Sequence, residues 1–247
     1  MPVTTAGTAN TLLNTVAAEV GLTPATDPWA SNEPQFVQMR VLLQLVGEEL
    51  CWLGEWEHLN RSYSITTAVG DTGLYDLPSD YLTMIQQTGW ELSNNTPLLG
   101  PLSPQDWAYL KGRDLVSQSI YANFRLQDGK FSVFPQPPPA GLVLDFEYRA
   151  NTFVQDPTTP EVKTAIINNG ADIVLFDKTL VSRYLKVKWL EAKGFDSTKA
   201  QDDVNMMFGL VQPADGAGGK ILSAGRSRRG FPYLNSRYNV RDTGYGN

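Results

Sequence analysis

The chain begins with hydrophobic residues at helical spacing. Over residues 8–20, apolar side chains lie three and four positions apart, which predicts a helix that stops at Gly21. A second helix is predicted from Pro34 to Leu59, because proline lacks an amide hydrogen and suits the first helical position. It carries two stripes at helical spacing: Phe36, Met39, Leu43, Val46, Leu50 and Leu53; and Leu42, Leu45, Glu49, Trp52, Trp56 and Leu59. Two stripes predict burial on two sides, either deep in the core or between the core and a neighbouring subunit.

The pattern changes to that of strands between residues 63 and 152. Alternating side chains, bounded by proline and glycine, predict strands over residues 63–69, 74–77, 82–92, 123–126, 130–134 and 142–149. Asp128-Gly129 predicts a tight hairpin between two of them. Ser103 has the position of an N-cap for a short helix that carries Trp107 and stops at Gly112. This segment is therefore predicted to be an antiparallel β module.

Helical spacing returns towards the C-terminus. A stripe from Ile173 to Leu190 predicts a helix closed by Gly194, and Asp196 or Thr198 caps a further helix that Pro213 ends. From residue 214 onward there is no sustained period, which is typical of an extended arm. The predicted fold class is α+β. It consists of a helical bundle (residues 1–62 and 153–212), an inserted antiparallel β domain (63–152) and an extended basic C-terminal arm (213–247).

Charge is distributed unevenly along the chain. The formal net charge is −6. Residues 213–247 hold six basic and two acidic side chains, a net +4, which leaves −10 for residues 1–212. The sequence thus predicts an acidic body with a basic tail.

The basic tail intersperses arginine with aromatic residues, a combination that three interpretations fit. It is a solvated tail, a nucleic-acid-binding segment, or an arm that docks on another protein. We favour docking, since arginine and aromatic side chains serve as anchors in protein interfaces and an acidic body argues against general nucleic-acid binding. The predicted anchors are Arg226, Arg228, Arg229, Phe231, Tyr233, Tyr238, Arg241 and Tyr245.

Candidate catalytic chemistry is sparse. The single histidine, His58, has no nucleophile and orienting group near it in the sequence, and the single cysteine, Cys51, lies among apolar neighbours. Residues 216–220 lack the glycine, the Ser/Thr and the preceding strand of a phosphate-binding loop. The spacing of Asp71, Asp76 and Asp80 does not fit a calcium loop. We therefore expect no enzyme activity, no cofactor and no bound metal.

Membrane insertion is not expected either. No apolar run approaches the roughly 20 residues that a membrane span requires. The N-terminal residues have neither the basic start nor the apolar centre of a signal peptide, so we expect synthesis in the cytoplasm.

Three segments of the β region resemble one family of proteins. They are YDLPSDYL (residues 75–82), PLLGPLSPQDW (97–107) and FRLQDGKFSVFPQPPPAGLVLDFEYRA (124–150). With the order helices, β insert, helices and arm, they are similar to the head-to-tail adaptor proteins of short-tailed bacteriophages, also called tail tubular or head-completion proteins.

This resemblance implies a structural virion protein, made in the host cytoplasm and placed at the head–tail junction. It implies a dodecameric ring beneath the portal protein that attaches tail or nozzle proteins and lets genomic DNA pass through its lumen without sequence-specific binding. The second stripe would then supply the ring interface, through Leu42, Leu45, Trp52 and Trp56, and the arm would bind the portal. The alternative is a cytoplasmic binding module whose β insert recognises a peptide or a carbohydrate; an enzyme ranks third.

Overall fold

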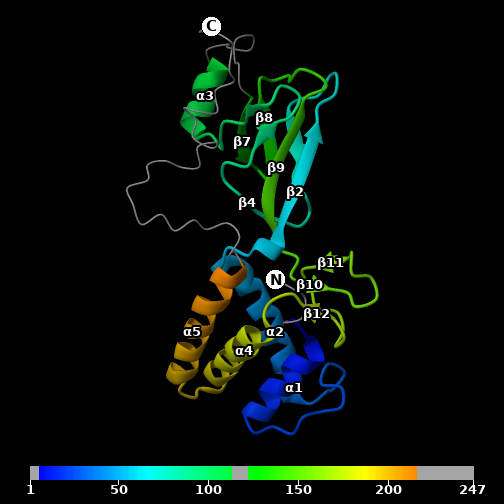
Figure 1. The fold of residues 1–247 in the computed structure, drawn as a ribbon, viewed down its shortest axis with the longest axis vertical. Coiled ribbons are helices and arrows are strands. Elements are labelled where there is room, and N and C mark those ends of the chain that lie inside the picture. Colours follow the sequence, from blue (N-terminus) through cyan, green and yellow to red (C-terminus); the bar gives the residue numbers. More distant parts are fainter. Residues whose placement is uncertain (1–5, 113–121, 216–247) are drawn as a thin grey trace. The chain divides into compact units, whose positions relative to one another are not determined.

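The computed structural model describes residues 6–112 and 122–215, which form two compact units (Figure 1). The helical unit comprises residues 6–60 and 150–215, and the β unit comprises residues 61–112 and 122–149. Helices and antiparallel sheets are both present, so the predicted α+β class is confirmed.

Four α-helices build the helical unit: α1 (Ala9–Glu19), α2 (Pro34–Leu53), α4 (Lys178–Lys193) and α5 (Thr198–Asp215). A short 3-10 helix, η2 (Glu57–Leu59), follows α2. Helix α4 packs against each of the other three and lies between α5 and the pair formed by α1 and α2 (Figure 1). The buried faces of the four helices meet in one apolar core, which includes Leu12, Val16, Phe36, Met39, Leu43, Leu180, Leu185 and Val204.

Side chains cap the starts of α1 and α4, and the predicted Gly194 ends α4. The Thr8 hydroxyl accepts from the Thr11 amide at 3.3 Å at the start of α1. The Asp177 carboxylate accepts from the Thr179 and Leu180 amides at 2.9 and 3.2 Å at the start of α4. Gly194 ends α4 at φ 75°, a left-handed conformation that glycine adopts without a Cβ penalty.

Replacing Asp177 with alanine is expected to destabilise the protein by about 1 kcal/mol, because two amides in the first turn of α4 lose their acceptor. Asp177→Asn keeps an oxygen at the same place and is expected to remain close to the wild type. Urea unfolding of the three proteins measures the difference. Equal stability of the alanine and asparagine variants would show that the cap contributes nothing.

A small antiparallel sheet also belongs to the helical unit, and the sequence pattern did not reveal it. Its strands pair in the order β1 (Gly7–Thr8), β12 (Ile173–Val174), β10 (Val154–Gln155) and β11 (Lys163–Thr164). Strands of two residues are too short to show alternation. The prediction of a helix from Ile173 was accordingly wrong at its start, because that residue pairs with Thr8 and the helix begins at Lys178.

The predicted extent of the second helix was also wrong. Helix α2 ends at Leu53, and Gly54 is extended with φ −131° and ψ 159°. Trp56 folds back over this glycine, where a Cβ would come within 2.8 Å of the indole, and its Nε1 donates to the Leu50 carbonyl at 2.5 Å. The indole thus satisfies one of the carbonyls that a helix end leaves without a partner. Trp56 and Leu59 therefore do not continue the stripe of α2.

Helix α5 extends further than predicted. Pro213 lies inside it rather than at its end, and residues 213–215, assigned from sequence to the arm, are helical. Proline removes one backbone hydrogen bond there, so the last turn depends on contacts from outside the helix. Asp215 makes such contacts, with Glu57 and His58.

Two antiparallel sheets make up the β unit. The larger contains β2 (Asn60–Thr66), β9 (Val143–Ala150), β5 (Trp90–Glu91) and β6 (Thr96–Pro97) in that order, with β4 (Tyr81–Met84) also paired to β9. The smaller has the order β3 (Leu74–Asp76), β8 (Lys130–Phe134) and β7 (Asn123–Gln127). The predicted single strand over residues 82–92 was wrong: Gln87, at φ 65°, lies in a turn that separates β4 from β5.

Stacked aromatic rings form the centre of the β unit. Phe131 of β8 stacks on Phe124 of β7 and on Phe146 of β9, with centroid distances of 4.9 and 5.0 Å. Asp128-Gly129 forms the predicted hairpin between β7 and β8, with both residues at positive φ. The predicted cap of α3 (Pro104–Gly112) is present as well, since the Asp106 amide donates to the Ser103 hydroxyl at 3.2 Å.

Candidate functional site

An exposed apolar stripe runs along α2 on the side opposite its buried face. We call it the outer face of α2 and define it by Val37, Val41, Leu45 and Trp52. Their exposed fractions are 42, 67, 39 and 67%. At 3.6 residues per turn these positions lie about half a turn away from Met39, Leu43, Val46 and Leu50, which are buried. A helix that is apolar on both sides needs a second surface to cover its outer face.

The structure separates the four residues predicted to form a ring interface. Leu45 and Trp52 lie on the outer face, and Leu42 is half-buried beside it. Trp56 is 1% exposed and packs edge-on against Phe176 with a centroid distance of 5.1 Å, so it belongs to the core of its own chain. Val37 and Val41 were missed, although Val37, Val41 and Leu45 follow one another at intervals of four residues in the sequence.

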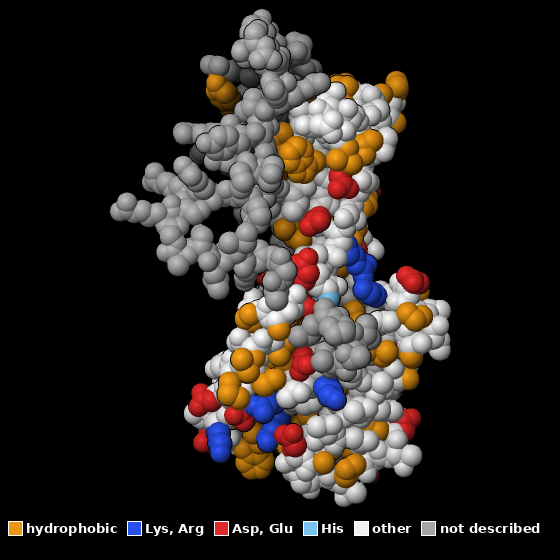
Figure 2. Space-filling model, viewed as in Figure 1, with side chains coloured by type: hydrophobic (Ala, Val, Ile, Leu, Met, Phe, Trp, Pro, Cys, Tyr) orange, Lys and Arg blue, Asp and Glu red, His pale blue; other side chains and the backbone are white. Residues whose placement is uncertain are grey.

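A second exposed apolar surface lies on α5. Met206 and Leu210 are 54 and 62% exposed and lie one helical turn apart. Figure 2 shows hydrophobic side chains gathered over this helix, whereas charged side chains are scattered over the helical unit. Helix α4 lies between α5 and α2, so the helical unit presents two apolar surfaces on different helices.

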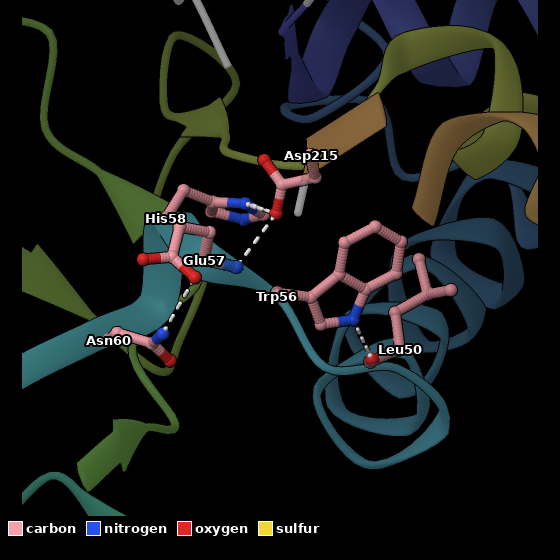
Figure 3. A network of polar contacts seen from close by, with 6 residues as sticks. All are labelled: Leu50, Trp56, Glu57, His58, Asn60 and Asp215. Atoms are coloured by element: carbon pink, nitrogen blue, oxygen red, sulfur yellow. Dashed lines mark hydrogen bonds and ion pairs between the residues drawn. The ribbon is translucent and has the colours of Figure 1, made fainter. Parts of the chain in front are cut away.

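A buried polar network links the end of α5 to the segment that follows α2 (Figure 3). Oδ2 of Asp215 accepts from the Glu57 amide and lies against Nδ1 of His58, both at 2.9 Å. The Asp215 side chain is fully buried, and that of His58 is 16% exposed. The His58 ring packs edge-on against Phe176, with a centroid distance of 5.4 Å, and tilts against Trp56.

Burial and the contact between the two side chains have opposite effects on the pKa of each member of this pair. Burial lowers the pKa of His58 below its usual value, and the neighbouring Asp215 carboxylate offsets part of that effect. The pKa of Asp215 is also below its usual value: burial alone would raise it, and the interaction with His58 lowers it. The ring is therefore neutral near pH 7, with Nδ1 donating to an ionised Asp215.

The comparison with known families decides the identity of the chain. The sequence model of the family described as SU10 adaptor protein matches residues 8–209. The chain belongs to the SU10 adaptor protein family. The resemblance to bacteriophage head-to-tail adaptors is thereby confirmed, and the protein is a structural phage adaptor, a component of the virion. A search of the curated proteins found no match.

The predicted arm of this adaptor lies outside the described residues. All eight predicted anchors, from Arg226 to Tyr245, belong to residues 216–247. Their role in binding the portal remains a prediction.

The titratable residues that sequence inspection singled out have structural partners in this adaptor. Asp71 accepts from the Ala68 amide and the Tyr75 hydroxyl, and Asp76 pairs with Lys130. Asp80 accepts from Arg61 and from Tyr148, at 2.5 and 2.9 Å. Burial and then the hydrogen bond to Asp80 raise the pKa of Tyr148 to about 12. Within residues 6–112 and 122–215, no three His, Cys, Asp or Glu side chains group so as to hold a metal ion.

The β unit of this adaptor contains a small hollow. Tyr81, Met84, Gln87, Leu98 and Phe124 contribute to its wall, and its volume is about 140 Å³. Ligand pockets usually measure about 300–1,000 Å³, so this hollow offers no particular support for a carbohydrate site. None of the helices in the described part of the chain has the length and apolarity needed to span a bilayer.

Proposed function

We propose that this adaptor assembles into a dodecameric ring that joins the portal protein to the tail and lets the genome pass through its lumen. The observation that carries this proposal is the outer face of α2, an apolar surface on a helix whose other side already forms the core. Membership of the adaptor family supports the same conclusion.

A ring requires two different surfaces on each subunit, because every copy contacts one neighbour on each side. The helical unit offers such a pair in the outer face of α2 and the apolar surface of α5 around Met206 and Leu210. In the proposed ring, the outer face of α2 in one copy covers the α5 surface of the next. A large aromatic side chain such as Trp52 is a suitable anchor for such a contact.

The acidic body supports a role in which DNA passes without being held. Residues 1–212 carry a net charge of −10, and DNA binding gains its sequence-independent affinity mainly from basic groups that displace counterions. A lumen lined from this body would repel the phosphate backbone rather than retain it.

The β unit is proposed to present a surface to tail or nozzle proteins. Val69 is 92% exposed at the turn after β2, where the Ala68 amide donates to Asp71 at 2.7 Å and the Tyr75 hydroxyl donates to the same carboxylate at 3.0 Å. An apolar side chain on a turn fixed in this way loses little conformational entropy on binding.

Imaging by negative stain, with and without purified portal, tests the assembly. Rings of this protein, alone or seated on the portal, are the expected result. A strict monomer that ignores portal rings would refute the adaptor ring and favour the alternative of a binding module.

Removing residues 220–247 is expected to weaken portal binding, because the proposed anchors of the arm are lost. Binding of the full chain should also weaken between low and high salt if Arg226, Arg228 and Arg229 contribute by charge. A full-length variant with these three arginines changed to glutamine is the matched control and should lose the salt dependence. Unimpaired binding by the shortened chain would exclude the arm as a portal ligand.

A further inference from the structure

Asp215 occupies an unusual position for a carboxylate. It is the last residue of α5 that the structure describes, and residues 216–247 follow it directly. A negative charge at a helix C-terminus is unfavourable, since the helix dipole places partial negative charge there, and full burial adds a further cost. Helix stability therefore does not explain why an acid occupies position 215. The contacts of Asp215 with Glu57 and His58 explain it.

The last turn of α5 is weak in isolation. Pro213 has no amide hydrogen and leaves the Gly209 carbonyl without its usual partner, and two of the turn's residues, Pro213 and Ala214, are exposed. The buried members of this part of the helix are Val211 and Asp215. A turn with few intrahelical bonds and few apolar contacts opens at low free energy unless another segment holds it.

The segment that holds this turn also connects the two units along the chain. Glu57 and His58 belong to η2, and Asn60, which ends the helical unit in sequence, is bound through its Nδ2 to the Glu57 carboxylate at 3.1 Å. Arg61 is the first residue of the β unit. One carboxylate therefore joins the end of α5 to the segment through which the chain enters the β unit (Figure 3).

We propose that Asp215, Glu57 and His58 form a latch that closes the last turn of α5 onto the segment leading into the β unit and opens when His58 is protonated. With the latch closed, the last turn of α5 and residues 57–60 are held together. With it open, the last turn of α5 and residues 57–60 are released together.

The geometry of the imidazole explains why acid opens the latch. Nδ1 donates to Asp215, whereas the buried Nε2 has no hydrogen-bond partner among the described residues. Protonation would place an N–H donor at Nε2, between apolar rings that offer no acceptor, and an unpaired buried donor costs free energy. The open state avoids this cost because the ring is exposed to water. Among the described residues, the charged groups that act on the ring are Asp215, which favours its protonation, and Lys163, which opposes it.

The sign of the pH dependence follows from these groups. The pKa of His58 is lowered in the closed state, so the open state binds more protons and becomes more populated as the pH falls through the ordinary histidine range. One linked proton changes the open-to-closed ratio by at most about tenfold per pH unit. The Asp215 carboxylate stays ionised in this window, because the interaction with His58 holds its pKa below the usual range of an aspartate.

Hydrogen exchange of the full chain between pH 7.5 and 5 tests the latch. The protection factor of the Glu57 amide and those of the last turn of α5 are expected to fall together as the pH decreases, while those of Val181 and its neighbours in α4 stay constant and report an intact fold. His58→Asn keeps a donor close to the position of Nδ1 but does not titrate, so its protection should be independent of pH. Asp215→Ala should leave both segments unprotected throughout.

Two outcomes would overturn the proposal. The first is independent loss of protection at Glu57 and at the end of α5. The second is an unchanged pH dependence in the His58→Asn variant. Asp215→Asn keeps an acceptor for both donors but removes the charge that favours protonation of His58, so it should be closed at pH 7.5 and should open at least as readily as the wild type when the pH falls. A variant already as open as Asp215→Ala at pH 7.5 would show that the charge, not the hydrogen bonds, closes the latch. The experiment needs neither ring nor portal, so its result is independent of the proposed function.

Discussion

Replacing Trp52 with glutamate is expected to abolish ring assembly while leaving the folded subunit intact. The side chain is 67% exposed, so the subunit loses little packing, but the buried contact in the ring would acquire an unpaired charge. Loss of a tryptophan anchor alone commonly weakens a protein contact by about 2–4 kcal/mol, and a ring repeats that loss at every junction. Mass photometry measures the assembly, and thermal unfolding measures the fold.

Val69→Glu is the matched control, since it places the same charge on an exposed apolar residue of the β unit and should leave the ring unaffected. Leu210→Glu, on α5, should block assembly as Trp52→Glu does. In a head-to-tail ring, a mixture of the two variants retains one functional junction and should give dimers but no rings. Rings formed by Trp52→Glu alone would exclude the outer face of α2 as the interface.

Gly47→Ala is expected to produce the largest loss of stability. Gly47 lies on the buried side of α2, and a Cβ there would stand 2.0 Å from the ring of Phe153, which is itself fully buried and stacks on Phe176. Two rigid rings cannot both move aside in a close-packed core, so overpacking should cost about 1–3 kcal/mol or more. Urea unfolding provides the measurement.

Gly209→Ala is the control for this substitution. Gly209 also lies within a helix, α5, but an added Cβ meets no atom within 4 Å. Alanine is the better helix former, so this variant should gain up to about 1 kcal/mol. Opposite signs for the same substitution in two helices would assign the loss at position 47 to the contact with Phe153. A neutral Gly47→Ala would contradict this explanation.

Local signals in the sequence predicted the features that depend on neighbouring residues. Apolar spacing over residues 8–20 marked the first helix, Asp128-Gly129 marked the hairpin, and Ser103 with Asp106 marked the cap of α3. Each works through contacts within four residues, so a pattern of residue types is sufficient to indicate it.

The errors share a different cause, since long-range contacts decided those positions. Helical spacing continued to Leu59, but the end of α2 is set by the return of Trp56 to the Leu50 carbonyl. Pro213 predicted a helix end, but Asp215 is held by Glu57 and His58, about 160 residues earlier in the chain. The turn between β4 and β5 places Gln87, rather than the nearby Gly89, at positive φ, so the residue type at the turn did not indicate the break.

At the candidate site, too, local pattern and long-range contacts determined different features. The double stripe of α2 indicated apolar side chains on two sides of the helix, but not which tryptophan faces outward, and burial of the second side stays a prediction. Trp52 and Trp56 have the same residue type and are four residues apart, and only the break at Gly54 gives them opposite environments. The partnership of His58 with Asp215 had no sequence signal, because the two residues come from distant segments.

Strands β2 and β9 are neighbours in one sheet, and through them the chain enters and leaves the β unit (Figure 1). The Thr67 amide bonds to the Leu142 carbonyl at 2.9 Å, and Ser64 bonds to Asp145, so the two strands run in opposite directions and bring positions 61 and 149 together. A module whose two ends are adjacent can be exchanged for another without lengthening the host. Replacement of residues 61–149 by recombination would then change the proposed tail-binding surface and leave unchanged the helices that we propose to build the ring.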